Sequence, residues 1–98
     1  MKTLHLVLAG KWYDLIDCGV KTSEYRACTP YWNRRFTGDP NSTDINLRQF
    51  VYDTVVFHRG YTNKTMKFRI DFIRILNSPF NDLHLDKCWE IKLGQRIN

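Results

Sequence analysis

Three short segments of this chain alternate apolar and polar residues with a period of two. Leucines occupy every second position over residues 4–8, large apolar residues do so over 66–72, and Trp89, Ile91 and Leu93 repeat the pattern near the end. This period places the apolar side chains on one face of an extended strand. The chain is therefore expected to bury one face of a sheet, and its 98 residues allow a single core.

Two further strands and two helices complete the expected set of elements. Residues 20–26 and the aromatic, β-branched run at 50–58 are predicted as strands. Three apolar residues spaced over 12–16 predict a short amphipathic helix, which Gly19 would end in a left-handed conformation. Thr29, followed directly by a proline, predicts the N-cap of a second helix.

Polar and turn-forming residues between these elements predict loops at 37–49, 59–64 and 77–87, the second of them a hairpin. The alternation changes phase at Ile73, which indicates a bulge of the kind that curls a sheet. We therefore predict an α+β chain, a small curled β-barrel of about five to six strands with two short helices. Residues 1–98 are expected to form one domain.

The positive charge of the chain is local. Residues 21–35 carry a net +3 and residues 57–74 a net +4, whereas the whole chain carries +5, so the remaining 65 residues are slightly acidic. Both windows also contain several aromatic residues. Cations contact phosphates and exposed rings stack on unpaired bases, so this pattern favours a nucleic-acid partner. The alternative is that the rings belong to the core and the cations form a solvated face.

The first basic window contains the motif G-x-K-x-x-E-x-R over residues 19–26. Glu24 and Arg26 are two residues apart, so in a strand they share a face and can pair. Lys21 reaches the same face only if it lies in the turn before the strand. A structural Glu24–Arg26 pair with a solvated lysine is the alternative to a functional site.

This octapeptide resembles the signature of the ASCH (activating-signal-cointegrator homology) domain, a β-barrel family of the PUA-like group. The similarity to small bacterial and phage-type members extends to the segments W-Y-D-L-I, T-P-Y-W, V-V-F-H-R-G-Y and W-E-I-K-L-G. The resemblance implies a cleft that accepts RNA or a nucleotide-like ligand. Lys21, Glu24 and Arg26 would line this cleft, and Gly19 would shape the turn.

The same resemblance implies two enzymatic alternatives. Some members resemble metal-assisted single-strand ribonucleases, in which Lys21 and Glu24 would share phosphodiester cleavage with a divalent metal. Others are N4-acetylcytidine amidohydrolases, but their motif has threonine at the position of Glu24, so this chain departs from that pattern. Asp71 is the candidate for the acid that those enzymes use. A protein-interaction module of a mobile element is a third hypothesis, which would use the same cleft or the 37–49 loop.

Five further residues are candidates for ligand binding. Tyr31 is expected to stack on a base while the neighbouring Trp32 packs inward, and Arg34 and Arg35 follow them in the sequence. Arg59 and Tyr61 belong to the predicted hairpin, a common place for function.

The cysteines, the histidines and the first apolar run indicate which metal sites, disulfides and cellular locations to expect. Three cysteines without C-x-x-C spacing and three scattered histidines predict neither a zinc site nor a disulfide framework. No stretch approaches the about 20 apolar residues of a membrane span, and the first apolar run is short for a signal peptide. We therefore expect a cytoplasmic protein with no membrane partner and no cofactor, apart from the metal that a ribonuclease would use.

Overall fold

Five strands and two helices make up the computed structural model, which describes residues 2–44 and 52–98. In chain order they are β1 (Thr3–Leu8), α1 (Gly10–Asp17), β2 (Ser23–Ala27), α2 (Pro30–Thr37), β3 (Thr54–Arg59), β4 (Thr65–Leu76) and β5 (Cys88–Arg96). The strands hydrogen-bond in one sheet in the order β1-β3-β4-β5-β2. This confirms the predicted class, an α+β fold with a small curled sheet and two short helices.

The described residues divide into two compact units. The first contains 2–23, 52–71 and 92–98, and the second contains 24–44 and 72–91. Strands β2, β4 and β5 contribute residues to both units. The expectation of a single domain stays a prediction.

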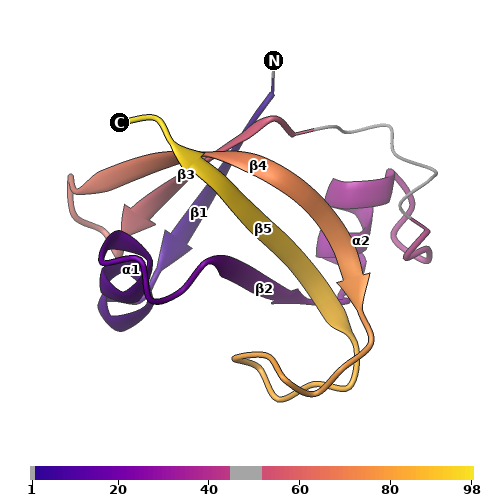
Figure 1. Cartoon of the computed structure of the whole chain (residues 1–98). Coiled ribbons are helices and arrows are strands. Elements are labelled where there is room, and N and C mark those ends of the chain that lie inside the picture. The colour runs from indigo at the N-terminus through magenta and orange to yellow at the C-terminus, as the bar shows by residue number, and fades with distance from the viewer. Residues whose placement is uncertain (1, 45–51) are drawn as a thin grey trace. The chain divides into compact units, whose positions relative to one another are not determined.

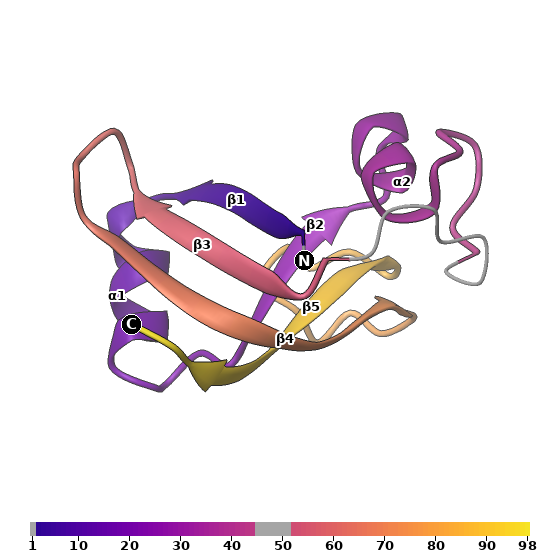
Figure 2. The same cartoon turned by 90° about the horizontal axis from the view of Figure 1, so that it is seen from above.

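In the first unit, β1 runs parallel to β3, and β3 pairs antiparallel with β4 (Figure 1). Leu6 lies beside Phe57 in the first ladder, and Phe57 beside Met66 in the second, all three buried. The hairpin loop between β3 and β4, seen well in Figure 2, contains Gly60 at φ +53°. The predicted hairpin and the period-two core of these strands are therefore present.

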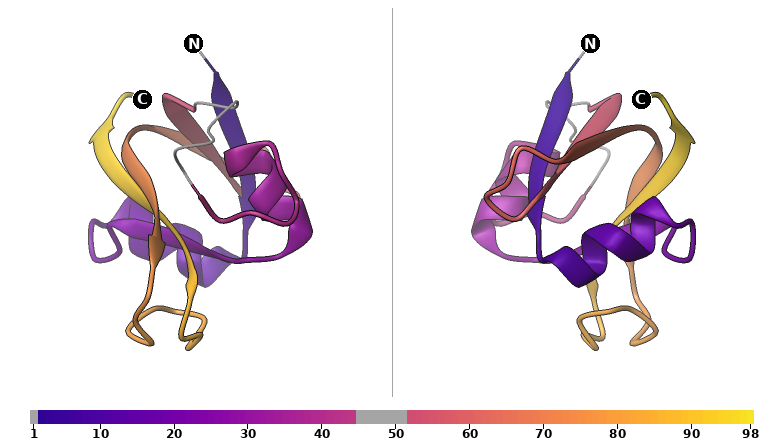
Figure 3. Two further views of the ribbon diagram at one scale, coloured as in Figure 1. Left: turned by 90° about the vertical axis from the view of Figure 1, so that its right-hand side faces the viewer. Right: turned by 90° about the vertical axis from the view of Figure 1, so that its left-hand side faces the viewer.

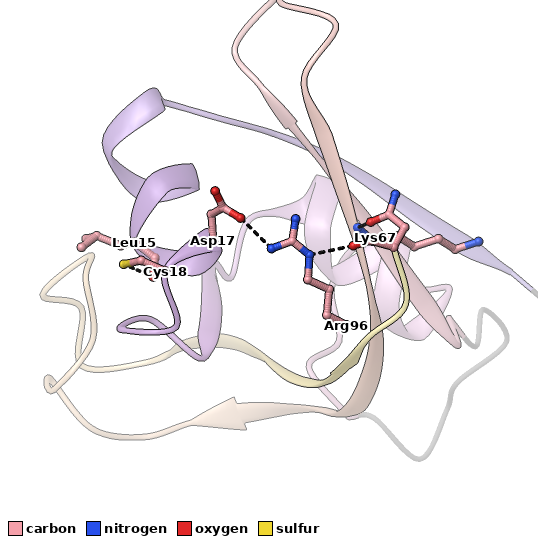
Figure 4. Close-up of polar contacts among 6 residues, drawn as sticks. Leu15, Asp17, Cys18, Lys67 and Arg96 are labelled. Carbon is pink, nitrogen blue, oxygen red and sulfur yellow. Dashed lines mark hydrogen bonds and ion pairs between the residues drawn. The ribbon is translucent and has the colours of Figure 1, made fainter.

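Helix α1 follows β1 directly (Figure 3, right) and buries Tyr13 and Ile16. Gly19 comes after its C-cap at φ +85°, as predicted, because this left-handed conformation is accessible to glycine without strain. Figure 4 shows how Arg96, at the end of β5, reaches Asp17 on this helix at 2.6 Å. No helix among the described residues has both the length and the apolar character to cross a bilayer.

The second unit has its core between α2 and β5. Thr29 caps α2 by accepting a hydrogen bond from the backbone N–H of Trp32 at 3.3 Å, which confirms the predicted N-cap. Phe36 packs on Trp89 with ring centroids 5.0 Å apart. The indole Nε1–H of Trp89 donates to Asn33 Oδ1 at 2.9 Å, so this buried polar pair is satisfied.

Three details differ from the sequence expectations. Strand β2 begins at Ser23, because the backbone N–H of Lys21 donates to the carbonyl of Leu15 and closes the turn after α1. Phe72, expected to face inward, is 40 % exposed. Glu90, expected to face solvent, is buried, and its charge is compensated by Arg74 at 2.7 Å. Part of the predicted 37–49 loop and of the 50–58 strand lies outside the described residues.

Candidate nucleic-acid interface

The motif residues Glu24 and Arg26 lie on one face of β2 and form an ion pair. Arg26 Nη2 donates to Glu24 Oε2 at 3.0 Å, and the backbone N–H of Tyr25 donates to Glu24 Oε1 at 3.1 Å. The side chain of Glu24 is 9 % exposed and that of Arg26 is 23 % exposed. The pairing expected from their spacing is therefore present, and it compensates a carboxylate that is nearly buried.

The guanidinium of Arg26 also lies against the indole of Trp32 in α2. Its Cζ atom is 5.2 Å from the ring centroid, within the range of cation–π attraction. Trp32 in turn stacks on Phe36, with centroids 5.7 Å apart and 20° between the ring planes. Arg26 Nε is buried and meets no acceptor among the described residues. Arg26 is thus held in place on two sides and still has an unused donor.

Tyr31 and Arg35 extend these contacts to the surface. The Tyr31 ring meets Trp32 edge-on, with centroids 4.8 Å apart at 90°. Arg35 Nη1 donates to Tyr31 Oη at 2.7 Å, and its Cζ lies 5.6 Å from the Tyr31 centroid. Residues four apart on a helix are neighbours, which explains this contact. Tyr31 is 58 % exposed, so much of its surface is open to a ligand.

We call Arg26, Tyr31, Trp32 and Arg35 the aromatic–arginine cluster. All four belong to the second unit, and a continuous series of contacts joins them. Arginines supply charge and planar donors for phosphate, and an exposed tyrosine supplies a face on which a base can stack. Arg34, also a predicted site residue, is exposed in the same last turn of α2.

Lys21 makes its described contacts in the first unit. Its Nζ lies 5.3 Å from the centroid of Trp12, and the Nζ of Lys11 lies 4.5 Å from the same ring. Lys92 Nζ donates to the hydroxyl of the neighbouring Thr22 at 2.9 Å. That Lys21 and Glu24 act together on one substrate stays a prediction.

Arg59, predicted to contact phosphate, forms a bidentate ion pair with Asp14 on α1. Its Nε and Nη2 atoms each donate to an Asp14 oxygen at 3.1 Å. These hydrogen bonds lower the pKa of the Asp14 carboxyl from its ordinary value. The guanidinium also lies over Gly10, where a Cβ atom would be 2.7 Å from Arg59 Nη2. In this arrangement Arg59 ties the end of β3 to α1.

The remaining predicted residues, Tyr61 and Asp71, lie in the first unit. Tyr61 is fully exposed in the loop between β3 and β4. Asp71 is exposed on β4, and its carboxylate lies where a side chain at Gly94 would have to go. Its role as a catalytic acid stays a prediction. Within 2–44 and 52–98, no three His, Cys, Asp or Glu side chains gather as a metal site.

Two tryptophans take part in cation contacts that the sequence patterns did not predict. Trp12 and Trp32 are each half-buried, with lysines over the first and Arg26 over the second. The stacking of Trp32 on Phe36 is as expected, so only the opposing arginine was missed. The spacing of four between Tyr31 and Arg35 signals only their own contact on the helix, and no local spacing signals that of Arg26 with Trp32.

Comparisons of the chain with family models, curated protein sequences and solved structures found no match. The resemblance to the ASCH family therefore stays a prediction.

Proposed function

We propose that this chain binds single-stranded RNA, or a ligand with the same base and phosphate groups, through the aromatic–arginine cluster. The observation that supports it most is the continuous contact series from Arg26 through Trp32 and Tyr31 to Arg35, with Tyr31 largely exposed. Arg35 and Trp32 both restrain Tyr31, so its ring loses less conformational freedom when it stacks on a base.

The favoured ligand is single-stranded because the exposed ring can contact only a base that is free to unstack. In a duplex the base faces are covered by their neighbours, and an RNA duplex is recognised mainly through backbone contacts. An aromatic face accepts any base, so the cluster supports binding with little sequence preference. Arg35, which contacts Tyr31, and Arg34 in the same turn of α2 would supply cations for the phosphates beside a stacked nucleotide.

The experiment is a fluorescence-anisotropy titration of a labelled single-stranded RNA at about 50 and 200 mM salt. Each phosphate contact releases counterions, so affinity is expected to fall steeply, with a slope of about −0.7 per contact in log–log form. Arg35→Gln is expected to weaken binding and reduce that slope. Arg69→Gln, which removes one charge at an exposed position of β4, serves as the control. An affinity that does not change with salt would argue against the proposal.

A further inference from the structure

The outward face of the β1–β3 ladder carries two imidazoles in direct contact. His5 Nδ1 and His58 Nε2 are 3.0 Å apart, and the ring centroids are 5.3 Å apart. In the parallel register His5 lies beside Val56, and His58 lies beside Val7. The histidines are therefore diagonal neighbours, and both point away from the core residues that flank them in sequence, such as Leu6 and Phe57.

We propose that His5 and His58 form a two-histidine binding site for a divalent transition-metal ion, with Zn²⁺ as the representative ligand. Neutral imidazole nitrogen is a preferred ligand of zinc, copper and nickel. With metal–nitrogen bonds of about 2.0–2.1 Å, two ligand nitrogens lie about 2.9 Å apart at a right angle and about 3.3 Å apart in a tetrahedral site. The observed 3.0 Å separation falls between these values, so the pair suits chelation once both rings turn their facing nitrogens toward the ion.

The proton balance of binding is simple when both rings are neutral. One ring nitrogen of the pair now donates its proton to the lone pair of the other, since a neutral imidazole has one N–H and one acceptor. For the metal to bind, the donating ring moves that proton to its other nitrogen, and both facing nitrogens then present lone pairs. Binding of the ion to two neutral rings therefore releases no net proton.

The surroundings predict an open and exchangeable site. Within the part of the chain that the structure describes, no third side chain joins the pair as a ligand, so water completes the coordination. On β4, Thr65 lies beside His58, Lys67 beside Val56 and Arg69 beside Thr54, which puts two cations on the same face. These positive charges repel the metal ion, so we expect moderate affinity and rapid exchange rather than a permanent structural metal.

The test is a calorimetric titration of Zn²⁺ into the full chain at about pH 7.5, above the ordinary histidine range. We expect one ion per chain, and at least tenfold weaker binding for His5→Gln and for His58→Gln. His84→Asn is the matched control, because it removes the third histidine, and asparagine tolerates the φ of +54° found there. Wild-type binding no tighter than in both glutamine variants, or an equal loss in His84→Asn, would overturn the proposal.

A second measurement needs no substitution and so does not depend on the folding of a variant. The imidazole nitrogen resonances of the wild-type protein are followed by NMR as Zn²⁺ is added. We expect the resonances of His5 and His58 to shift together while those of His84 stay in place. Unchanged His5 and His58 resonances at saturating Zn²⁺ would contradict the site directly.

Discussion

Arg26 donates a 3.0 Å hydrogen bond to Glu24, whose side chain is only 9 % exposed. Removing the cation therefore leaves a nearly buried carboxylate without its arginine. Arg26→Met is expected to lower the free energy of unfolding by about 1–3 kcal/mol, less than for a fully buried pair because Arg26 is partly solvated. Urea unfolding followed by tryptophan fluorescence measures this change.

The double variant Glu24→Leu with Arg26→Met is the control for this pair. Replacing both partners removes the uncompensated charge, so the double variant is expected to recover part of the loss. If Arg26→Met alone unfolds at the same urea concentration as the wild type, the pair does not stabilise the fold as described.

Asn33 accepts the indole hydrogen bond of Trp89 inside the second unit and donates to the carbonyl of Pro40 at 3.2 Å. Asn33→Ala removes that acceptor from a buried N–H, at an expected loss of about 1–3 kcal/mol. Thermal unfolding by circular dichroism measures it. In a double-mutant cycle with Trp89→Phe, the two losses of unfolding free energy should not add, because both substitutions break the same hydrogen bond. Additive losses would show that the bond contributes nothing.

Thr29 caps α2, the helix that carries Tyr31 and Arg35. Thr29→Ala is expected to destabilise the protein by about 1 kcal/mol, whereas Thr29→Ser keeps the hydroxyl and most of the stability. Chemical denaturation of both variants compares them. Equal destabilisation by alanine and serine would mean that the cap hydrogen bond is unimportant.

The three thiols differ in burial, which predicts an order of alkylation. Desolvation raises the pKa of Cys28 and of Cys88, so their reactive thiolate forms are scarce near neutral pH. Cys18 is exposed and Cys88 is buried. At pH 8 iodoacetamide should therefore label Cys18 first and Cys88 only after unfolding, as resolved by mass spectrometry. Early labelling of Cys88 would contradict its placement in the core.

The raised thiol pKa values also give a direction for stability against pH. A group that holds its proton more tightly when folded contributes stability that is present below its unfolded pKa. That contribution is lost as the pH rises through the folded pKa. Unfolding midpoints should accordingly fall at alkaline pH, and replacing Cys28 and Cys88 together by alanine should reduce that fall.

Local patterns in the sequence were sufficient for the elements and for the Glu24–Arg26 pair. The period-two runs predicted β1 and β5, and the spacing of two residues predicted which side chains share a face in β2. The contact between Arg26 and Trp32 could not be predicted in this way, because it depends on how the chain turns between β2 and α2. The solvent-facing position predicted for Glu90 was wrong for a similar reason. Alternation alone does not reveal Arg74 on β4, which compensates the charge of Glu90 and allows it to be buried.

The most direct test of RNA binding by the aromatic–arginine cluster is the dissociation constant of Tyr31→Ala for single-stranded RNA. Loss of one stacked base is worth about 1–3 kcal/mol, so affinity should fall about fivefold to 150-fold. Phe80→Ala is the control, because Phe80 is an aromatic ring of the same unit that is 89 % exposed. The dissociation constant of Phe80→Ala is expected to equal that of the wild type. Equal binding by Tyr31→Ala and the wild type would contradict RNA binding by the cluster.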